Sequence, residues 1–142
     1  MGPVFRDPRL RAALVLSPGA PRAGSARRAF SAVSIPWMLM TGTEDEAPIG
    51  GQTPASPREV FPALPPGSKY ELVLFGAQHG VFTDAPLAWE RPRPNPRHHR
   101  AILALSTAFW DAYLRGDGRA RAWLEGAGPP TVLHPADLWQ KK

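Results

Sequence analysis

The sequence contains no cysteine, and this absence excludes several kinds of site at once. Without thiols the chain cannot form a disulfide scaffold, a thiolate zinc site or a cysteine nucleophile. Long hydrophobic runs are also absent, since none approaches the roughly 18 residues needed to cross a bilayer. The N-terminus lacks the basic-then-apolar order of a signal peptide. We therefore expect no membrane span and no export signal, with a cytoplasmic location as the default.

The chain still has the material for a hydrophobic core. Its 142 residues include 18 Pro and 13 Gly, but 43% are hydrophobic. This length is close to the common size of a protein domain. The sequence therefore predicts a single domain over 1–142, with an irregular tail from about 126 to 142.

The formal charge of +5 makes a nucleic-acid partner the first alternative to weigh. Such binding needs clustered or striped Lys and Arg that neutralise adjacent phosphates. The two densest Arg stretches, 22–28 and 91–97, have neither interleaved aromatic residues nor helical spacing. We expect a solvated basic surface and no nucleic-acid partner; a binding module would instead show affinity that falls steeply with salt.

Three short apolar runs, bounded by Pro and Gly, predict strands that are buried on both faces. They lie at 12–16, 37–40 and 69–75. A short helix is expected at 57–61, with Ser56 as N-cap. One long helix should begin near Pro96 and end at about Leu114, with apolar stripes on two sides, and a shorter one should cover 119–124.

This pattern predicts a layered α/β architecture with three mostly parallel strands and flanking helices. Three strands are too few for such a sheet, because its faces and edges must be covered. The chain is therefore expected to be part of something larger or to associate with a partner that completes the sheet. Alone, it should expose a strand edge and a helix stripe, and be poorly soluble or oligomeric.

Two reactive side chains follow neighbouring strands of the predicted sheet. Asp45 comes after the second strand and His79 after the third, and the carboxyl ends of parallel strands meet at one edge. An Asp that accepts from one ring nitrogen of His leaves the other nitrogen as a base. Glu44 and Glu46 compete with Asp45 for the acidic role.

The segments Gly42-Thr43-x-Asp45-x-x-Pro48 and Gly76-Ala77-x-His79-Gly80, each following a strand, resemble the acid and histidine segments of the α/β-hydrolase family. The nearest resemblance is to its dienelactone-hydrolase and platelet-activating-factor-acetylhydrolase-like branch. The helix over 101–114 resembles the last helix of that fold. The resemblance covers nearly the whole chain but only the C-terminal half of the family's fold, so it implies a partial, three-layer α/β-hydrolase domain without its first strands.

The family's nucleophile motif, Gly-x-Ser-x-Gly, is missing from this sequence. Ser17 follows a strand, but the next residue is Pro18, which has no N–H to serve as an oxyanion donor. We therefore reject Ser17 as nucleophile and expect the serine to be outside this chain.

The resemblance implies a hydrolase of small-molecule carboxylic esters, in which Asp45 and His79 are the acid and the base of a Ser-Asp-His triad. It implies no metal and no organic cofactor. The partner would be the missing N-terminal half or another copy. The alternative is a non-catalytic truncated fragment, or an interaction partner, without turnover.

Other side chains receive simpler interpretations. Phe82 and Trp89 follow the histidine segment and are candidates for lining a substrate pocket. His98 and His99 are expected to be polar residues in a first helical turn, because neighbours on a helix point about 100° apart and seldom chelate one ion. Gly50-Gly51 predicts a flexible turn.

Overall fold

The computed structural model describes residues 7–21, 24–48, 50–83, 85–91 and 93–142; parts of both Arg-rich stretches, at 22–23 and 92, lie outside these ranges. The strands are β1 (Ala13–Leu16), β2 (Trp37–Glu44), β3 (Lys69–Gln78) and β4 (Leu138–Lys141). The α-helices are α1 (Ala26–Phe30), α2 (Val60–Ala63), α3 (Pro96–Leu114) and α4 (Gly118–Glu125). Short 3-10 turns, η1 (Ser56–Glu59), η2 (His79–Phe82) and η3 (Pro129–Thr131), complete the chain.

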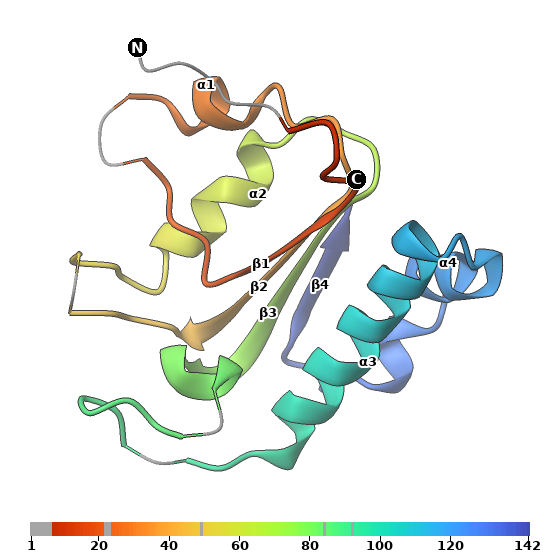
Figure 1. Ribbon diagram of the computed structural model, residues 1–142. Helices are drawn as coiled ribbons and strands as arrows, with labels where there is room; N and C mark the ends of the chain where they lie inside the picture. Colours follow the sequence, from red (N-terminus) through yellow and green to blue (C-terminus); the bar gives the residue numbers. More distant parts are fainter. Residues whose placement is uncertain (1–6, 22–23, 49, 84, 92) are drawn as a thin grey trace.

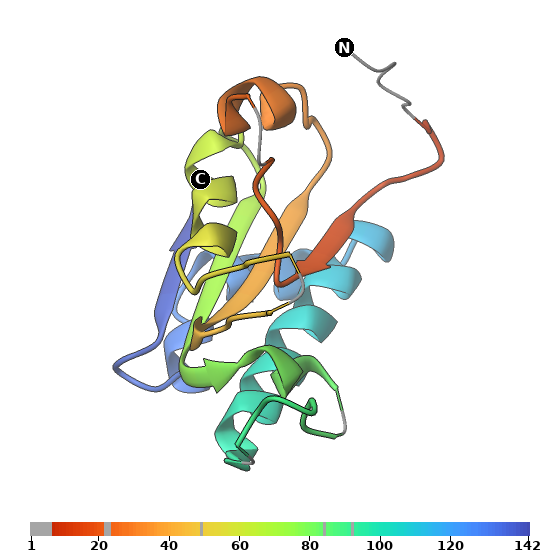
Figure 2. The same ribbon diagram turned by 90° about the vertical axis from the view of Figure 1, so that its left-hand side faces the viewer.

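The four strands form one open, mostly parallel sheet in the order β1-β2-β3-β4 (Figure 2). β1 pairs with β2, and β2 with β3, in parallel, with Val15 beside Leu39 and Leu39 beside Glu71. The predicted mixed α/β class and the three parallel strands are confirmed. β2 and β3 are longer than predicted, because their polar ends also join the ladder.

The number of strands is the main correction. The sequence predicted an irregular tail, but Leu138–Lys141 forms β4 and pairs antiparallel with β3. Lys142 extends this pairing, because its N–H and carbonyl oxygen both bond to Lys69 at 2.9 Å. The tail therefore covers the outer edge of β3, and in the described part of the chain the sheet ends at β1 on one side and at the short β4 on the other.

Helices cover both faces of the sheet (Figure 1). α1 and α2 lie on one face and α3 and α4 on the other. On the first face, Leu39 packs in a cluster with Val60 and Phe61. On the second, Met38 belongs to a larger cluster that includes Phe109. Neighbouring residues of a strand thus pack against helices on opposite faces of the sheet, which is why the strands are apolar without alternation.

The long helix α3 matches its predicted bounds. Asn95 is its N-cap, with the side-chain oxygen accepting from the N–H of Arg97. Its inner stripe is buried in the core, whereas Leu103 and Leu114 on the outer side are 68% and 46% exposed. The helix therefore exposes part of the second apolar stripe that the sequence predicted, while Trp110 of that stripe packs against the core.

The helix expected at 57–61 is different in detail. A 3-10 turn occupies Ser56–Glu59, and α2 follows at Val60–Ala63. Ala55, not Ser56, is the N-cap of the turn. Ser56 instead bonds back to Thr53, since its Oγ accepts from the N–H of that residue at 3.2 Å. Helix α1 was not predicted.

Candidate active site

Three polar side chains come directly after the three parallel strands. Ser17 follows β1, Asp45 follows β2 and His79 follows β3. Because the carboxyl ends of parallel strands lie at one edge, the fold brings all three together. The structure thus places Asp45 and His79 in contact, as the strand order predicted, and adds Ser17 to them.

Asp45 is the buried centre of this group, with its side chain fully inaccessible to solvent. Its Oδ2 accepts from Thr41 Oγ1 at 2.6 Å. Its Oδ1 accepts from Ser17 Oγ at 2.9 Å and, more weakly, from Gln52 Nε2 at 3.3 Å. A buried carboxylate needs such donors to offset the loss of water.

His79 provides the shortest contact to Oδ1 of Asp45, at 2.7 Å from its Nδ1. A carboxylate oxygen has no proton to give, so Nδ1 carries the hydrogen and donates it. In the neutral ring the other nitrogen, Nε2, is then the unprotonated one. Nε2 has no hydrogen-bond partner among the described residues, and the side chain is 31% exposed. The arrangement holds a base at the surface of the site.

Ser17 contacts the same side of the imidazole. Its Oγ lies 3.0 Å from Nδ1, the nitrogen bonded to Asp45, and not against Nε2. Nδ1 therefore cannot accept the serine proton, which goes to Asp45. This geometry agrees with the rejection of Ser17 as a nucleophile, but sequence reasoning missed its contact with the carboxylate.

Gln52 is a second residue that sequence reasoning missed. It lies in the loop after β2, where an isolated bridge pairs it with Ala47 through two backbone bonds of 3.1 Å. Its Nε2 donates to Ser17 Oγ at 2.6 Å. This contact could not be predicted from the sequence, because a bridge between two loop residues produces no hydrophobic periodicity.

Strands β2 and β3 approach each other closely beside the site. A Cβ on Gly42 would lie 2.0 Å from the carbonyl oxygen of Ala77, so only glycine fits there. The β2–β3 register shifts between Gly42 and Glu44, and Thr43 Oγ1 accepts from the N–H of Gly76 at 2.8 Å. This irregularity at the strand ends sets where Asp45 leaves β2.

The carboxylate of Glu90 ties the histidine turn to the loop after it. It accepts from the N–H of Gly80 at 2.6 Å through Oε1 and from that of Leu87 at 2.9 Å through Oε2. The residue after His79 is thus fixed by a charge-assisted bond.

The competing acids do not contact the histidine. Glu44 pairs with Arg93 at 3.1 Å, and both side chains are open to solvent. Glu46 is exposed. Among the described residues, Asp45 is the titratable side chain within bonding distance of His79.

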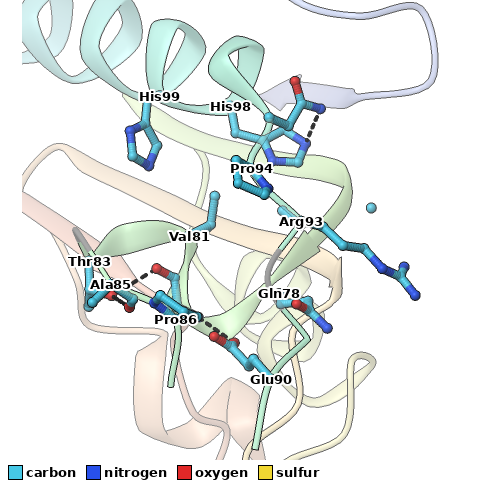
Figure 3. A pocket seen from close by; sticks show the side chains of 14 residues that line it. Gln78, Val81, Thr83, Ala85, Pro86, Glu90, Arg93, Pro94, His98 and His99 are labelled. Atoms are coloured by element: carbon cyan, nitrogen blue, oxygen red, sulfur yellow. Dashed lines mark hydrogen bonds between the residues drawn. The ribbon is translucent and has the colours of Figure 1, made fainter. Parts of the chain in front are cut away.

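A cavity of about 160 Å³ lies beside the histidine turn, between that turn, the loop over 83–95 and the first turn of α3 (Figure 3). Its lining includes Val81, Glu90 and His99. Phe82 packs against the core and Trp89 is 41% exposed, and neither lines this cavity. A substrate contact by either residue stays a prediction.

The two adjacent histidines have different environments. Both lie in the first turn of α3, as predicted; His99 is exposed, whereas His98 is buried at 6% exposure. Its Nε2 donates to the carbonyl oxygen of Phe75 at 2.9 Å, and so ties α3 to β3. No group of three metal-ligating side chains occurs among the described residues.

Two further observations bear on the class of protein. No helix in the described ranges is long and apolar enough to cross a membrane. In comparisons with known proteins, no family model and no curated protein matches the sequence.

Proposed function

We propose that this chain supplies the acid and the base of a serine hydrolase that cleaves small carboxylic esters. The observation that carries the proposal is the 2.7 Å bond from His79 Nδ1 to the buried Asp45 Oδ1, with Nε2 left unpartnered among the described residues. An imidazole oriented in this way by a carboxylate is the base that acyl transfer needs. The resemblance of the two segments to the α/β-hydrolase family supports the same function.

In the proposed reaction a serine hydroxyl from outside this chain attacks the ester carbonyl, and His79 Nε2 takes its proton. Asp45 stays charged and stabilises the imidazolium that forms. The proton then passes from Nε2 to the leaving alcohol, and an acyl-enzyme remains. Water, activated by the same nitrogen, releases the acid.

The fold supports the view that the domain is completed by further strands. The sheet is open beside β1, and the site lies at the carboxyl ends of the strands, where a nucleophile on a neighbouring parallel strand would also end. A second copy of this chain would not supply the motif, because the sequence has no Gly-x-Ser-x-Gly. The proposed partner is therefore the portion of an α/β-hydrolase domain that carries the serine.

The second candidate is a fragment without turnover. It is favoured by the lack of that motif and predicts no ester hydrolysis under any condition. Reading the DNA upstream of the Met1 codon for an in-frame Gly-x-Ser-x-Gly separates the two candidates cheaply.

The decisive test uses a protein that joins this chain to such an upstream segment, assayed with p-nitrophenyl acetate. His79→Ala should lower kcat/KM by at least about 100-fold, since triad members act as a unit. The matched control is His99→Ala, which removes an exposed imidazole and should leave the rate unchanged. Activity of His79→Ala within twofold of the unsubstituted protein would exclude His79 as the base.

A further inference from the structure

Two of the side chains around the buried carboxylate of Asp45 form an ordered chain of hydrogen bonds. Gln52 Nε2 donates to Ser17 Oγ at 2.6 Å, and Ser17 Oγ donates to Asp45 Oδ1 at 2.9 Å. A hydroxyl has one hydrogen and two lone pairs, and one lone pair here accepts from the amide. The serine hydrogen points away from the amide and is donated to the carboxylate.

This direction decides where the protons of the histidine lie. Ser17 Oγ, Asp45 Oδ1 and His79 Nδ1 are mutually within 3.0 Å. Two hydrogens must separate the three atoms, because facing lone pairs at these distances repel. The serine hydroxyl donates its hydrogen to Oδ1. The second hydrogen must then belong to Nδ1, which leaves Nε2 as the unprotonated nitrogen of the neutral ring.

Both donors are held by the backbone. Ser17 extends the β1–β2 ladder through its N–H, which donates to the carbonyl oxygen of Met40 at 2.7 Å. Its φ of +48° is in the left-handed region, which is uncommon for a residue other than glycine. Such strained residues cluster at functional sites. Gln52 is fixed by its bridge to Ala47.

From these contacts we infer that Ser17 and Gln52 are positioning residues, which give the Asp45 carboxylate its hydrogen bonds and lock His79 in the tautomer with hydrogen on Nδ1. We call the two residues the Ser17–Gln52 clamp. The inference rests on the proposed function for its catalytic meaning, since a base at Nε2 is useful where a nucleophile meets it. Neither residue touches the reacting atoms in this scheme.

The test follows the imidazole of His79 by NMR in the chain with 15N-labelled histidine. In the unsubstituted chain the neutral ring should show the Nδ1–H tautomer. In Ser17→Ala the signals of the tautomer with hydrogen on Nε2 should appear beside it, because one of the two clamp residues is gone. Gln52→Met should loosen the serine hydrogen and give a smaller share of the same second tautomer.

The matched control is Ser106→Ala, which removes a hydroxyl on α3 whose bond is to the carbonyl oxygen of Leu103. It should leave the tautomer of His79 unchanged. If Ser17→Ala does not fold, Gln52→Met still decides, because its side chain is outside the sheet. A His79 tautomer that stays unchanged in the folded clamp variants would overturn the inference.

A second readout tests the rival role of Ser17. A fluorophosphonate reagent labels activated serines, and it should not label this chain. Labelling that is lost in Ser17→Ala would overturn the positioning role and make Ser17 a nucleophile. The NMR result is independent of ester hydrolysis. If the chain joined to a serine-bearing segment had no esterase activity while the clamp variants still changed the tautomer, the proposed function would be refuted and the clamp would stand.

Discussion

The indole ring of Trp139 stacks on the phenol ring of Tyr70, with centroids 5.6 Å apart and planes inclined by 16°. The contact joins β4, the last strand, to the middle of the core, because Tyr70 is 1% exposed and belongs to the α3 side of the sheet. The phenol oxygen of Tyr70 is in turn 2.6 Å from that of Tyr113 on α3. The C-terminal strand is thus part of the core and not an appendage.

We predict that Trp139→Ala lowers the free energy of unfolding by about 2–4 kcal/mol, as for other large-to-small core changes. Trp139→Phe should cost less, because the ring can still stack and the indole N–H, which has no partner among the described residues, is removed. Urea denaturation measures both. Trp89→Ala, at an exposed loop position, is the control, and an equal loss there would contradict the role given to β4.

Gly42→Ala should disrupt the site by separating the strands that form it. The added Cβ would meet the Ala77 backbone, which cannot swing away as a side chain can. Overpacking of this kind costs about 1–3 kcal/mol. Gly118→Ala is the matched control, because nothing lies within 4 Å of a Cβ there and alanine favours the helix. A thermal melt of Gly42→Ala at or above that of the unsubstituted chain would refute the close approach.

The buried carboxyl of Glu71 should make the stability of the chain depend on pH. Burial raises the pKa of Glu71, although Gln140, Arg58 and Lys142 act in the opposite direction. Its Oε1 has no hydrogen-bond partner in the described part of the chain. The folded state therefore holds the proton more tightly than the unfolded state does, and this contribution to stability decreases as pH rises above the ordinary pKa of glutamate.

Glu71→Gln should accordingly raise the melting temperature at pH 7 and have a smaller effect near pH 4, where the carboxyl is already protonated. The amide oxygen still accepts from Gln140, the present partner of the carboxylate. Glu59→Gln, at an exposed position, should show no such trend. A larger gain at pH 4 than at pH 7 would reverse the sign argued here.

The outer stripe of α3 should drive self-association of the isolated chain. Leu103 and Leu114 lie there with 68% and 46% of their surface exposed. Replacing both with Glu should shift the sedimentation profile toward monomer, since exposed apolar patches mark interfaces or aggregation sites. Thr107→Glu adds charge to the same helix at an exposed position without removing an apolar group. A monomeric unsubstituted chain would contradict this prediction.

Much of the architecture could be predicted because local patterns specify it. The runs at 12–16, 37–40 and 69–75 are apolar without alternation, which is the pattern of strands covered on both faces. Parallel pairing then brings the residues after each strand to one edge of the sheet, so the meeting of Asp45 and His79 results from their places in the sequence. Pro96 and the apolar stripes fixed the bounds of α3 in the same way.

The remainder depends on contacts between distant segments. The tail at Leu138–Lys141 becomes a strand because β3 offers a free edge and Tyr70 a surface for Trp139, and neither is visible in four residues. The burial of Glu71 within an otherwise apolar strand is equally non-local. Ser17 was considered only as a nucleophile, and its contacts with Asp45 and Gln52 join residues that are 28 and 35 positions apart in the sequence.

The antiparallel strand at the C-terminus makes the two sides of the sheet different. With the flank of Lys69–Gln78 occupied by Leu138–Lys141, the open flank of the three parallel strands is that of Ala13–Leu16. A strand added there in parallel would end beside Ser17, in the row that continues to Asp45 and His79. Extension of the parallel part of the sheet would therefore enlarge the edge that carries these three side chains.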